Sequence, residues 1–293
     1  MPKQRVDRSS RPQEMTDWTE RPQPFLKWAG GKSQMLRNLE ERFPRHFSKY
    51  YEPFLGGGAV FFRLVEKYPP FSAVLSDSNE ELINAYEVVK TNVEQLVETL
   101  KTHKANYDHQ PKEYYYQVRK QRPFGRVEKA ARLIFLNKTC YNGLYRVNRK
   151  GEFNVPFGKY ENPRILDEKN LRTASGVLNY TNAELLTADY QEATKDASKG
   201  DFIYFDPPYQ PVSSTANFTS YTHSGFSLDE QKRLGVWFKE LDKRGCTVLL
   251  SNSNAREVRD IYSGYDIETA PAVRAISCKG NKRKGHTELI IHN

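Results

Sequence analysis

The feature that most constrains the fold is a pair of apolar segments separated by a run of three glycines. Residues 50–55 are typical of a strand, residues 56–58 are all glycine, and a second strand over residues 73–75 ends at Asp77. A strand, a glycine turn and an acid about 20 residues further on form the usual nucleoside-cofactor arrangement. The glycines let a ligand approach the backbone, and the acid accepts hydrogen bonds from ribose hydroxyls. The pattern predicts an α/β fold with such a site, although three glycines can also form an ordinary turn.

A different kind of sequence interrupts this α/β pattern. Apolar residues follow Asp77 at helical spacing, with Ser78 expected as the N-cap and Glu81 completing a capping box. From about residue 101 to residue 166 the alternation of strands and helices stops, and Tyr, Arg, Lys and Asn become frequent. This composition predicts an inserted domain with a working surface.

The alternation returns after the insertion. Residues 201–206 are typical of an apolar strand, and residues 227–244 of a helix that begins at Ser227 and ends at Gly245. Residues 247–250 form a short, wholly apolar strand, as expected for a buried position in a sheet. We therefore predict one α/β domain with an insertion.

Charge and composition narrow the class of protein. The chain has 45 Lys and Arg against 36 Asp and Glu, a formal charge of +9, which fits a polyanionic partner. No apolar run approaches the roughly 18 residues of a membrane span, and residues 1–24 lack the apolar core of a signal peptide. Cys140, Cys246 and Cys278 lack the paired spacing of a zinc site or disulfide framework. We expect a cytoplasmic protein with reduced thiols, no metal and no membrane contact.

The most informative four residues are Asp206, Pro207, Pro208 and Tyr209, which follow the predicted strand over residues 201–206. In an open α/β sheet, ligands bind at the carboxyl ends of strands. Methyl transfer to an exocyclic amine would use the Asp206 carboxylate and the Pro207 carbonyl to accept hydrogen bonds from the amine, which localises the nitrogen lone pair and stabilises the developing positive charge. The Tyr209 ring would stack on a base turned out of the helix. Alternatively, the two prolines form only a rigid turn.

Two further segments carry polar and aromatic groups. The sequence Gly31-Lys32-Ser33 suggests a phosphate loop, but the leading glycine of that motif would fall at Leu26, so no ATPase is predicted. Residues 141–151 combine an Asn-Gly turn with groups that read base edges or stack on bases; a solvated basic hairpin is the alternative. A last basic segment, expected to face phosphates, contains Lys279, Lys282, Arg283 and Lys284.

Together these motifs resemble the Dam-like N6-adenine DNA methyltransferases, which act on GATC sites. The resemblance spans residues 24–291 and rests on segments in family order: 25–32 (FLKWAGGK), 52–58 (EPFLGGG), 141–146 (YNGLYR), 153–158 (FNVPFG) and 206–209 (DPPY). It implies a Rossmann-like methyltransferase sheet with helices on both faces, interrupted by a smaller, mainly helical target-recognition domain with a hairpin loop. The domains expected are a mobile polar tail (1–23), a discontinuous catalytic domain (24–80 and 167–293) and the inserted recognition domain (81–166).

The resemblance also implies ligands and residue roles. S-adenosylmethionine is the implied cofactor and double-stranded DNA the partner of a monomer from a prokaryotic, archaeal or phage context, such as a restriction-modification system. The implied catalytic residues are Asp206, Pro207 and Tyr209. The implied cofactor-binding residues are Trp28, Lys32, Phe54, Gly56, Gly58, Asp77, Asp189, Tyr190 and Asp206. The implied DNA-recognition residues are Lys27, Tyr141, Asn142, Leu144, Arg146 and Pro156.

Within that last group, Lys27 and Arg146 correspond to guanine contacts, and Tyr141 to the aromatic that fills the gap left by the extruded base. Tyr145 matches no motif and receives no role. Two alternatives stay open: a cytosine-N4 or RNA methyltransferase, and a catalytically silent nucleic-acid-binding module. Asp rather than Ser before the prolines argues against the first. The intact set of cofactor residues argues against the second.

Overall fold

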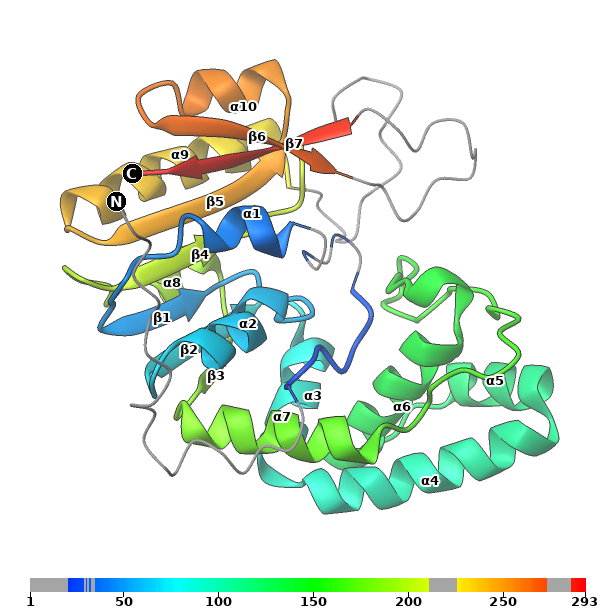
Figure 1. Cartoon of the computed structure of the whole chain (residues 1–293). Coiled ribbons are helices and arrows are strands. Elements are labelled where there is room, and N and C mark those ends of the chain that lie inside the picture. The colour runs from blue at the N-terminus through cyan, green and yellow to red at the C-terminus, as the bar shows by residue number, and fades with distance from the viewer. Residues whose placement is uncertain (1–20, 29, 31, 33–34, 211–225, 273–285) are drawn as a thin grey trace, which may run out of the picture.

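The computed structural model describes residues 21–28, 30, 32, 35–210, 226–272 and 286–293. Within them, a mixed sheet has the strand order β3-β2-β1-β4-β5-β7-β6. The strands are β1 (Lys49–Glu52), β2 (Ser72–Asp77), β3 (Glu184–Thr187), β4 (Phe202–Phe205), β5 (Thr247–Ser253), β6 (Asp266–Ala272) and β7 (His286–His292). Strands β1 to β5 are parallel, whereas β7 pairs antiparallel with both β5 and β6. The predicted α/β fold is confirmed (Figure 1).

Helices cover both faces of this sheet because its central strands are apolar on both sides. Along β4, Phe202 and Tyr204 face one hydrophobic cluster, whereas Ile203 and Phe205 face the other. All four side chains are fully buried, which explains the uninterrupted apolar run in the sequence. The first face packs against α1 (Leu36–Glu40), α2 (Ala59–Lys67), α3 (Glu80–Thr91) and α7 (Glu168–Tyr180). The second packs against α8 (Tyr190–Ala193), α9 (Leu228–Lys243) and α10 (Arg256–Ile261).

The chain segment that connects β2 to β3 forms a helical layer at one edge of the sheet (Figure 1). It contains α4 (Val93–His109), α5 (Pro111–Lys120), α6 (Arg126–Thr139) and the short helix η3 (Tyr141–Gly143). The loop after α6 is closed by two isolated antiparallel bridges, Cys140 to Phe157 and Val147 to Phe153. The predicted inserted domain, residues 81–166, stays a prediction, as does its boundary at residue 81, because one hydrophobic cluster runs from the sheet through α3 into α4 and α6.

Helix ends agree with the sequence pattern at one place and differ at another. The Ser227 side chain accepts a hydrogen bond from the Glu230 N–H at 3.2 Å, so the predicted cap of α9 is confirmed. The prediction that Ser78 caps the next helix is wrong. Asn79 is the N-cap of α3 and accepts from the Leu82 N–H at 3.2 Å. The Asn79 N–H is itself bound by Asp77, which delays the helix start by one residue.

Some expectations concern residues at or beyond the edges of the described structure. The polar tail lies mostly outside the described residues. At its end the Gln23 backbone exchanges two hydrogen bonds of 3.0 Å with the Asn170 side chain. The basic segment Lys279 to Lys284 and Cys278 also lie outside them, whereas Cys140 and Cys246 are buried free thiols. No helix of the described part is long and apolar enough to cross a membrane.

Candidate active site

The two central strands β1 and β4 bring the glycine turn and the proline tetrad together. Tyr50 and Tyr51 of β1 pair in parallel with Phe202 and Ile203 of β4, so the two strands end side by side. The chain leaves β1 toward β2 on one side and leaves β4 toward β5 on the other. This is the topological switch point at which open α/β sheets bind ligands.

The carboxylate of Asp206, at the end of β4, lies in a polar cluster. The Lys32 ammonium lies 2.8 Å from Asp206 Oδ1, and Ser251 Oγ on β5 donates to the same oxygen at 2.9 Å. Ser251 in turn shares a 2.8 Å hydrogen bond with the Tyr204 hydroxyl. Burial raises the pKa of Asp206, while Lys32, Ser251 and Tyr209 oppose that rise because they stabilise the charged form.

The backbone after Asp206 is held by buried amides. Gln231 Nε2 donates to the Pro208 carbonyl at 3.0 Å, and Asn252 Nδ2 donates to Gln231 Oε1 at 2.9 Å. Gln231 and Asn252 are fully buried. No described residue donates to the Pro207 carbonyl, so this oxygen and the Asp206 carboxylate are acceptors at the strand end. Gln231 was not predicted; a glutamine on the apolar face of α9 was the available signal.

Lys32 and Tyr209 complete the tetrad's surroundings. Lys32 is 5% exposed, donates to the Gly30 carbonyl at 2.7 Å and lies 4.7 Å from the centroid of the Tyr209 ring. The Tyr209 hydroxyl donates to Glu288 Oε2 on β7 at 2.7 Å. The Tyr209 side chain is therefore held by Lys32 over its ring and by Glu288 at its hydroxyl. The sequence motifs had predicted Lys32 and Tyr209 for this region but not Glu288.

The glycine turn after β1 is fixed by the acid at the end of β2. The Gly56 N–H donates to Asp77 Oδ2 at 3.1 Å, and the Asn79 N–H donates to Oδ1 at 3.0 Å. Gly56 has φ +48°, and a Cβ there would lie 2.7 Å from Cδ1 of Trp28. Only glycine fits this position, because the backbone has a positive φ and Trp28 occupies the space that a side chain would need.

An aromatic group lies beside this turn. The Phe54 ring is 5.6 Å from that of Tyr190 and 5.8 Å from that of Phe226. Asp189 caps α8 by accepting from the Gln191 N–H at 3.0 Å and forms a 2.9 Å ion pair with Arg233. The structure thus places Tyr190 next to Phe54, but its side chain is only 2% exposed, whereas Phe54 is half-buried.

Apart from Lys27, the predicted recognition residues lie on the loop after α6. Asn137, buried on α6, accepts from the Lys27 N–H at 2.8 Å and donates to the carbonyls of Lys27 and Gly143 at 2.7 and 3.0 Å. This amide joins the segment before Trp28 to the turn that contains Asn142, whose φ is +56°. Tyr141 is 45% exposed. Asn137 was not predicted, because nothing local distinguishes it from other polar residues.

Arg146 is exposed and oriented by one neighbour. Its Nε donates to Asn154 Oδ1 at 2.6 Å, and its Nη2 to the Asn154 carbonyl at 3.3 Å. Among the described residues, Arg146 Nη1 has no hydrogen-bond partner. The Tyr141 N–H donates to the Pro156 carbonyl at 2.8 Å, while Leu144 is half-buried. The two halves of the recognition segment therefore form one unit.

A family model of the D12 class N6 adenine-specific DNA methyltransferases matches residues 28–276. The chain belongs to this family. It is 46% identical over 286 residues to the Type II methyltransferase M.MjaIII of Methanocaldococcus jannaschii, covering 92% of this chain and 98% of that protein. It is 36% identical over 274 residues to the DNA adenine methylase of Haemophilus influenzae, covering 91% and 92%. The resemblance to adenine methyltransferases is confirmed, and methylation of adenine in DNA is the activity of the enzyme.

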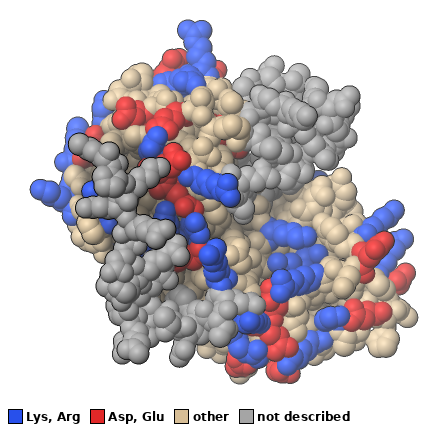
Figure 2. Space-filling view, in the orientation of Figure 1, with Lys and Arg blue, Asp and Glu red and all other residues tan. Residues whose placement is uncertain are grey.

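Lys and Arg side chains are spread over the visible face of this D12-class methyltransferase, and some of them lie between the sheet domain and the inserted helices. Figure 2 shows one group of these side chains in the middle of the face, where the inserted helices border the sheet domain. DNA-binding enzymes use such surfaces to neutralise phosphates. Within the described residues, no group of three His, Cys, Asp or Glu side chains could hold a metal ion.

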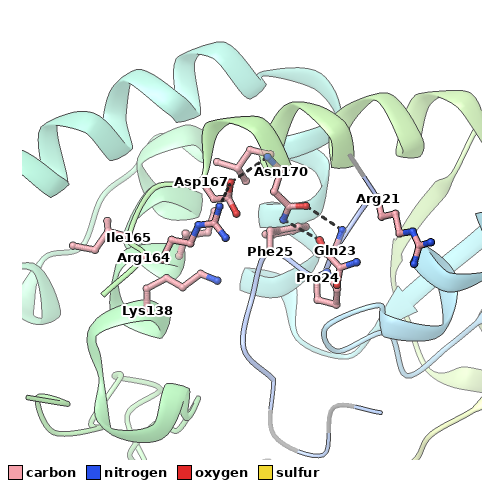
Figure 3. Close-up of a pocket in the computed structure, with 11 residues that line it drawn as sticks. Arg21, Gln23, Pro24, Phe25, Lys138, Arg164, Ile165, Asp167 and Asn170 are labelled. Carbon is pink, nitrogen blue, oxygen red and sulfur yellow. Dashed lines mark hydrogen bonds and ion pairs between the residues drawn. The ribbon is translucent and has the colours of Figure 1, made fainter. Parts of the chain in front are cut away.

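A separate cavity of about 200 Å³ lies where residues 21–25 of the methyltransferase meet α6 and α7 (Figure 3). Among the side chains around it are Lys138 and Arg164. Burial lowers the pKa of Lys138 to about 8, and the nearby Lys27 adds to this effect. The cavity shares no residue with the tetrad or the glycine turn, so we assign it no part in the reaction.

Proposed function

We propose that this DNA adenine methyltransferase takes its methyl group from S-adenosylmethionine and acts, as a monomer, on the adenine of GATC in duplex DNA. The target base would be turned out of the helix into the pocket formed by residues 206–209. The observation that carries this proposal is the pair of acceptors at the end of β4, the Asp206 carboxylate and the Pro207 carbonyl. They adjoin the glycine turn on the neighbouring strand.

The residues around the glycine turn fit a nucleoside cofactor. Gly56 and Gly58 both have positive φ, and Trp28 and Tyr86 pack where their side chains would lie, so the two glycines allow the tight turn that would face the cofactor. The Asp77 carboxylate accepts the Gly56 N–H at one oxygen and the Asn79 N–H at the other, and a carboxylate has lone pairs for further donors such as a ribose hydroxyl. Phe54 offers a half-buried ring for an adenine. When bound, S-adenosylmethionine supplies an electrophilic methyl group.

The tetrad provides the electrostatic part of the mechanism. Asp206 and the Pro207 carbonyl would each accept a hydrogen bond from the adenine amine, which withdraws the nitrogen lone pair from the ring. As the nitrogen gains positive charge, the nearby carboxylate stabilises it. Lys32 and Ser251 hold the carboxylate in place before the base arrives. The Tyr209 ring, fixed by Glu288, would stack on the extruded base.

The choice of GATC rests on the recognition segment within the proposed domain 81–166. Residues 141–146 and 153–158 match that segment of the Dam-like enzymes. Arg146, with one edge bound to Asn154, presents a donor edge suited to the O6 and N7 atoms of guanine. Lys27 would contact a second guanine, and the exposed Tyr141 would fill the gap left by the adenine. Asn142, Leu144 and Pro156 would complete the contact surface.

The test is transfer of tritiated methyl from S-adenosylmethionine to two matched duplexes, one with GATC and one with that site scrambled. Transfer to the first alone, recovered as N6-methyladenine after digestion, is the expected result. Equal transfer to both would discard the GATC assignment and keep the adenine chemistry. Absence of transfer to either, with the cofactor bound, would remove duplex DNA of this sequence as the substrate.

A further inference from the structure

Tyr145 is the residue of the recognition segment to which the family resemblance gives no role, yet it has three well-defined partners. Its ring stacks on Trp28 with centroids 5.5 Å apart and an interplanar angle of 25°. Its edge meets Phe153 at 5.9 Å and 67°. Its hydroxyl donates to Glu81 Oε2 at 3.0 Å. The side chain is half-buried.

These partners belong to three different parts of the enzyme. Phe153 lies on the returning half of the recognition hairpin, bridged to Val147. Glu81 is in the first turn of α3, close after Asp77. Trp28 precedes Lys32 and packs on the glycine turn, where a Cβ on Gly56 would lie 2.7 Å from Cδ1 of the indole. One tyrosine therefore contacts the recognition hairpin and the tryptophan that covers the turn after β1.

The contacts continue beyond Trp28 to the end of β2. Trp28 packs against Gly56, and the N–H of Gly56 donates to Asp77 Oδ2. A shift of the Tyr145 ring would change the position of Trp28, and with it the space above the glycine turn. Tyr145 directly precedes Arg146, the proposed guanine contact, in the chain. DNA that fixes Arg146 would thus also restrict the adjoining backbone that carries the Tyr145 ring.

We propose that Tyr145 is a positioning residue that couples DNA recognition to the cofactor site by holding Trp28 against the glycine turn. This inference rests on the proposed function, because it takes residues 141–146 as the DNA contact and the turn as the cofactor site. Since coupling between two ligands is reciprocal, DNA containing the recognised site increases cofactor affinity, and cofactor increases affinity for that DNA. The ring carries the effect, and the hydroxyl only anchors it to α3.

The experiment measures the dissociation constant of S-adenosylhomocysteine by calorimetry, with and without a GATC duplex. The full-length enzyme is compared with Tyr145→Phe, Tyr145→Leu and a control, Tyr114→Leu. Tyr114 is a half-buried ring of the same inserted helices that packs on His103 and Phe135, away from Trp28. Each variant is first checked for a cooperative unfolding transition.

In the wild type we expect the duplex to tighten binding of S-adenosylhomocysteine by about 5-fold or more, the lower end of usual coupling. Tyr145→Leu loses most of this enhancement and binds the ligand alone about 2- to 10-fold more weakly, the value of a stacked aromatic pair. Tyr145→Phe and Tyr114→Leu keep the enhancement. Recovery of coupling by phenylalanine separates positioning from a general loss of stability.

An unchanged enhancement in Tyr145→Leu, or a wild-type enzyme in which the duplex does not alter ligand affinity, would overturn the coupling while leaving the proposed function intact. Loss of the enhancement in Tyr114→Leu as well would assign the effect to stability of the insertion and reject the positioning role. A folded wild-type enzyme that binds no S-adenosylhomocysteine would instead overturn the proposed cofactor, and the coupling with it.

Discussion

The ammonium of Lys32 lies 2.8 Å from the carboxylate of Asp206, and little of either group is exposed. The two effects on this acid oppose each other, because burial favours its protonated form and the cation favours its charged form. The pKa of Asp206 remains above its ordinary value even with the ion pair in place. Lys32 therefore determines how far into the acidic range Asp206 stays charged, as its proposed role as acceptor for the adenine amine requires.

Replacing Lys32 should move the acidic limb of the pH profile. In Lys32→Gln the pKa of Asp206 rises further. When the pH is lowered, Asp206 is then protonated, and activity is lost, at a higher pH than in the wild type. We expect this shift in kcat/KM for DNA, measured with saturating cofactor from about pH 5 to about pH 9. Lys49→Gln, which removes a cation paired with Glu184 on the sheet edge, should leave the limb unchanged. An acidic limb that does not move in Lys32→Gln would show that Asp206 is not the group titrating there.

Replacing Asp206 should abolish most of the reaction without abolishing DNA binding. Asp206→Ala removes one preorganised electrostatic partner of the amine, a loss worth about 10²- to 10³-fold in rate. Single-turnover methylation and DNA affinity by anisotropy, measured on the same preparation, separate the two effects. Because the substitution leaves the buried Lys32 unpaired, stability should also fall, and Asp206→Asn serves as the shape-conserving comparison. Turnover near the wild-type rate in either variant would contradict the proposed mechanism.

Asn154 should affect the same base pair as Arg146. Arg146→Ala should lose about 1–3 kcal/mol of discrimination at one guanine, the usual value of a bidentate base contact. Asn154→Ala should lose less at that same position, since the guanidinium is retained without its anchor on Nε. The measurement is kcat/KM on duplexes with each base pair changed in turn. Arg149→Ala, at the exposed hairpin tip, is the control for a sequence-independent loss. Equal weakening on all duplexes would make Arg146 a phosphate contact.

His103 should make the inserted helices sensitive to acid. Its ring stacks on Phe135 at 5.1 Å, and burial lowers its pKa from 6.5 to about 4. Between these values the unfolded chain binds a proton that the folded chain does not, so stability falls as the pH falls. The expected loss from pH 7 to pH 5 is about 2 kcal/mol.

His103→Gln keeps a hydrogen-bonding group for the Tyr114 hydroxyl and cannot take up the proton. Urea unfolding at both pH values should therefore show a smaller loss in the variant than in the wild type. Equal losses in the two proteins would mean that His103 takes up its proton as readily in the folded protein as in the unfolded chain.

Local patterns were sufficient for much of the fold. The strand, glycine turn and second strand ending at Asp77 were predictable because their signals lie within one short stretch of sequence. The same holds for the helix between Ser227 and Gly245, where a cap and a left-handed glycine mark the ends. The start of α3 was misplaced by one residue because Ser78 and Asn79 can both cap a helix. The deciding contact is the bond from the Asn79 N–H to Asp77.

The residues that support the site were not predictable in the same way. Ser251, Gln231 and Glu288 contact the tetrad from β5, α9 and β7, and each is an ordinary polar residue in its own stretch of sequence. Their roles depend on which elements become neighbours in the folded sheet. The partners of Tyr145 likewise come from sequence positions on both sides of it, so its place beside Trp28 is apparent only in three dimensions.

The pairing of β1 with β4 has a consequence for how such enzymes can diverge. Neighbouring strands lie about 4.8 Å apart, so backbone hydrogen bonds hold the turn proposed for the methyl donor close to the tetrad proposed for the target base. The recognition loop belongs to a separate excursion of the chain that begins and ends at the β2–β3 edge. Substitutions in that loop can therefore change the DNA sequence that is recognised without changing the residues that carry out methyl transfer.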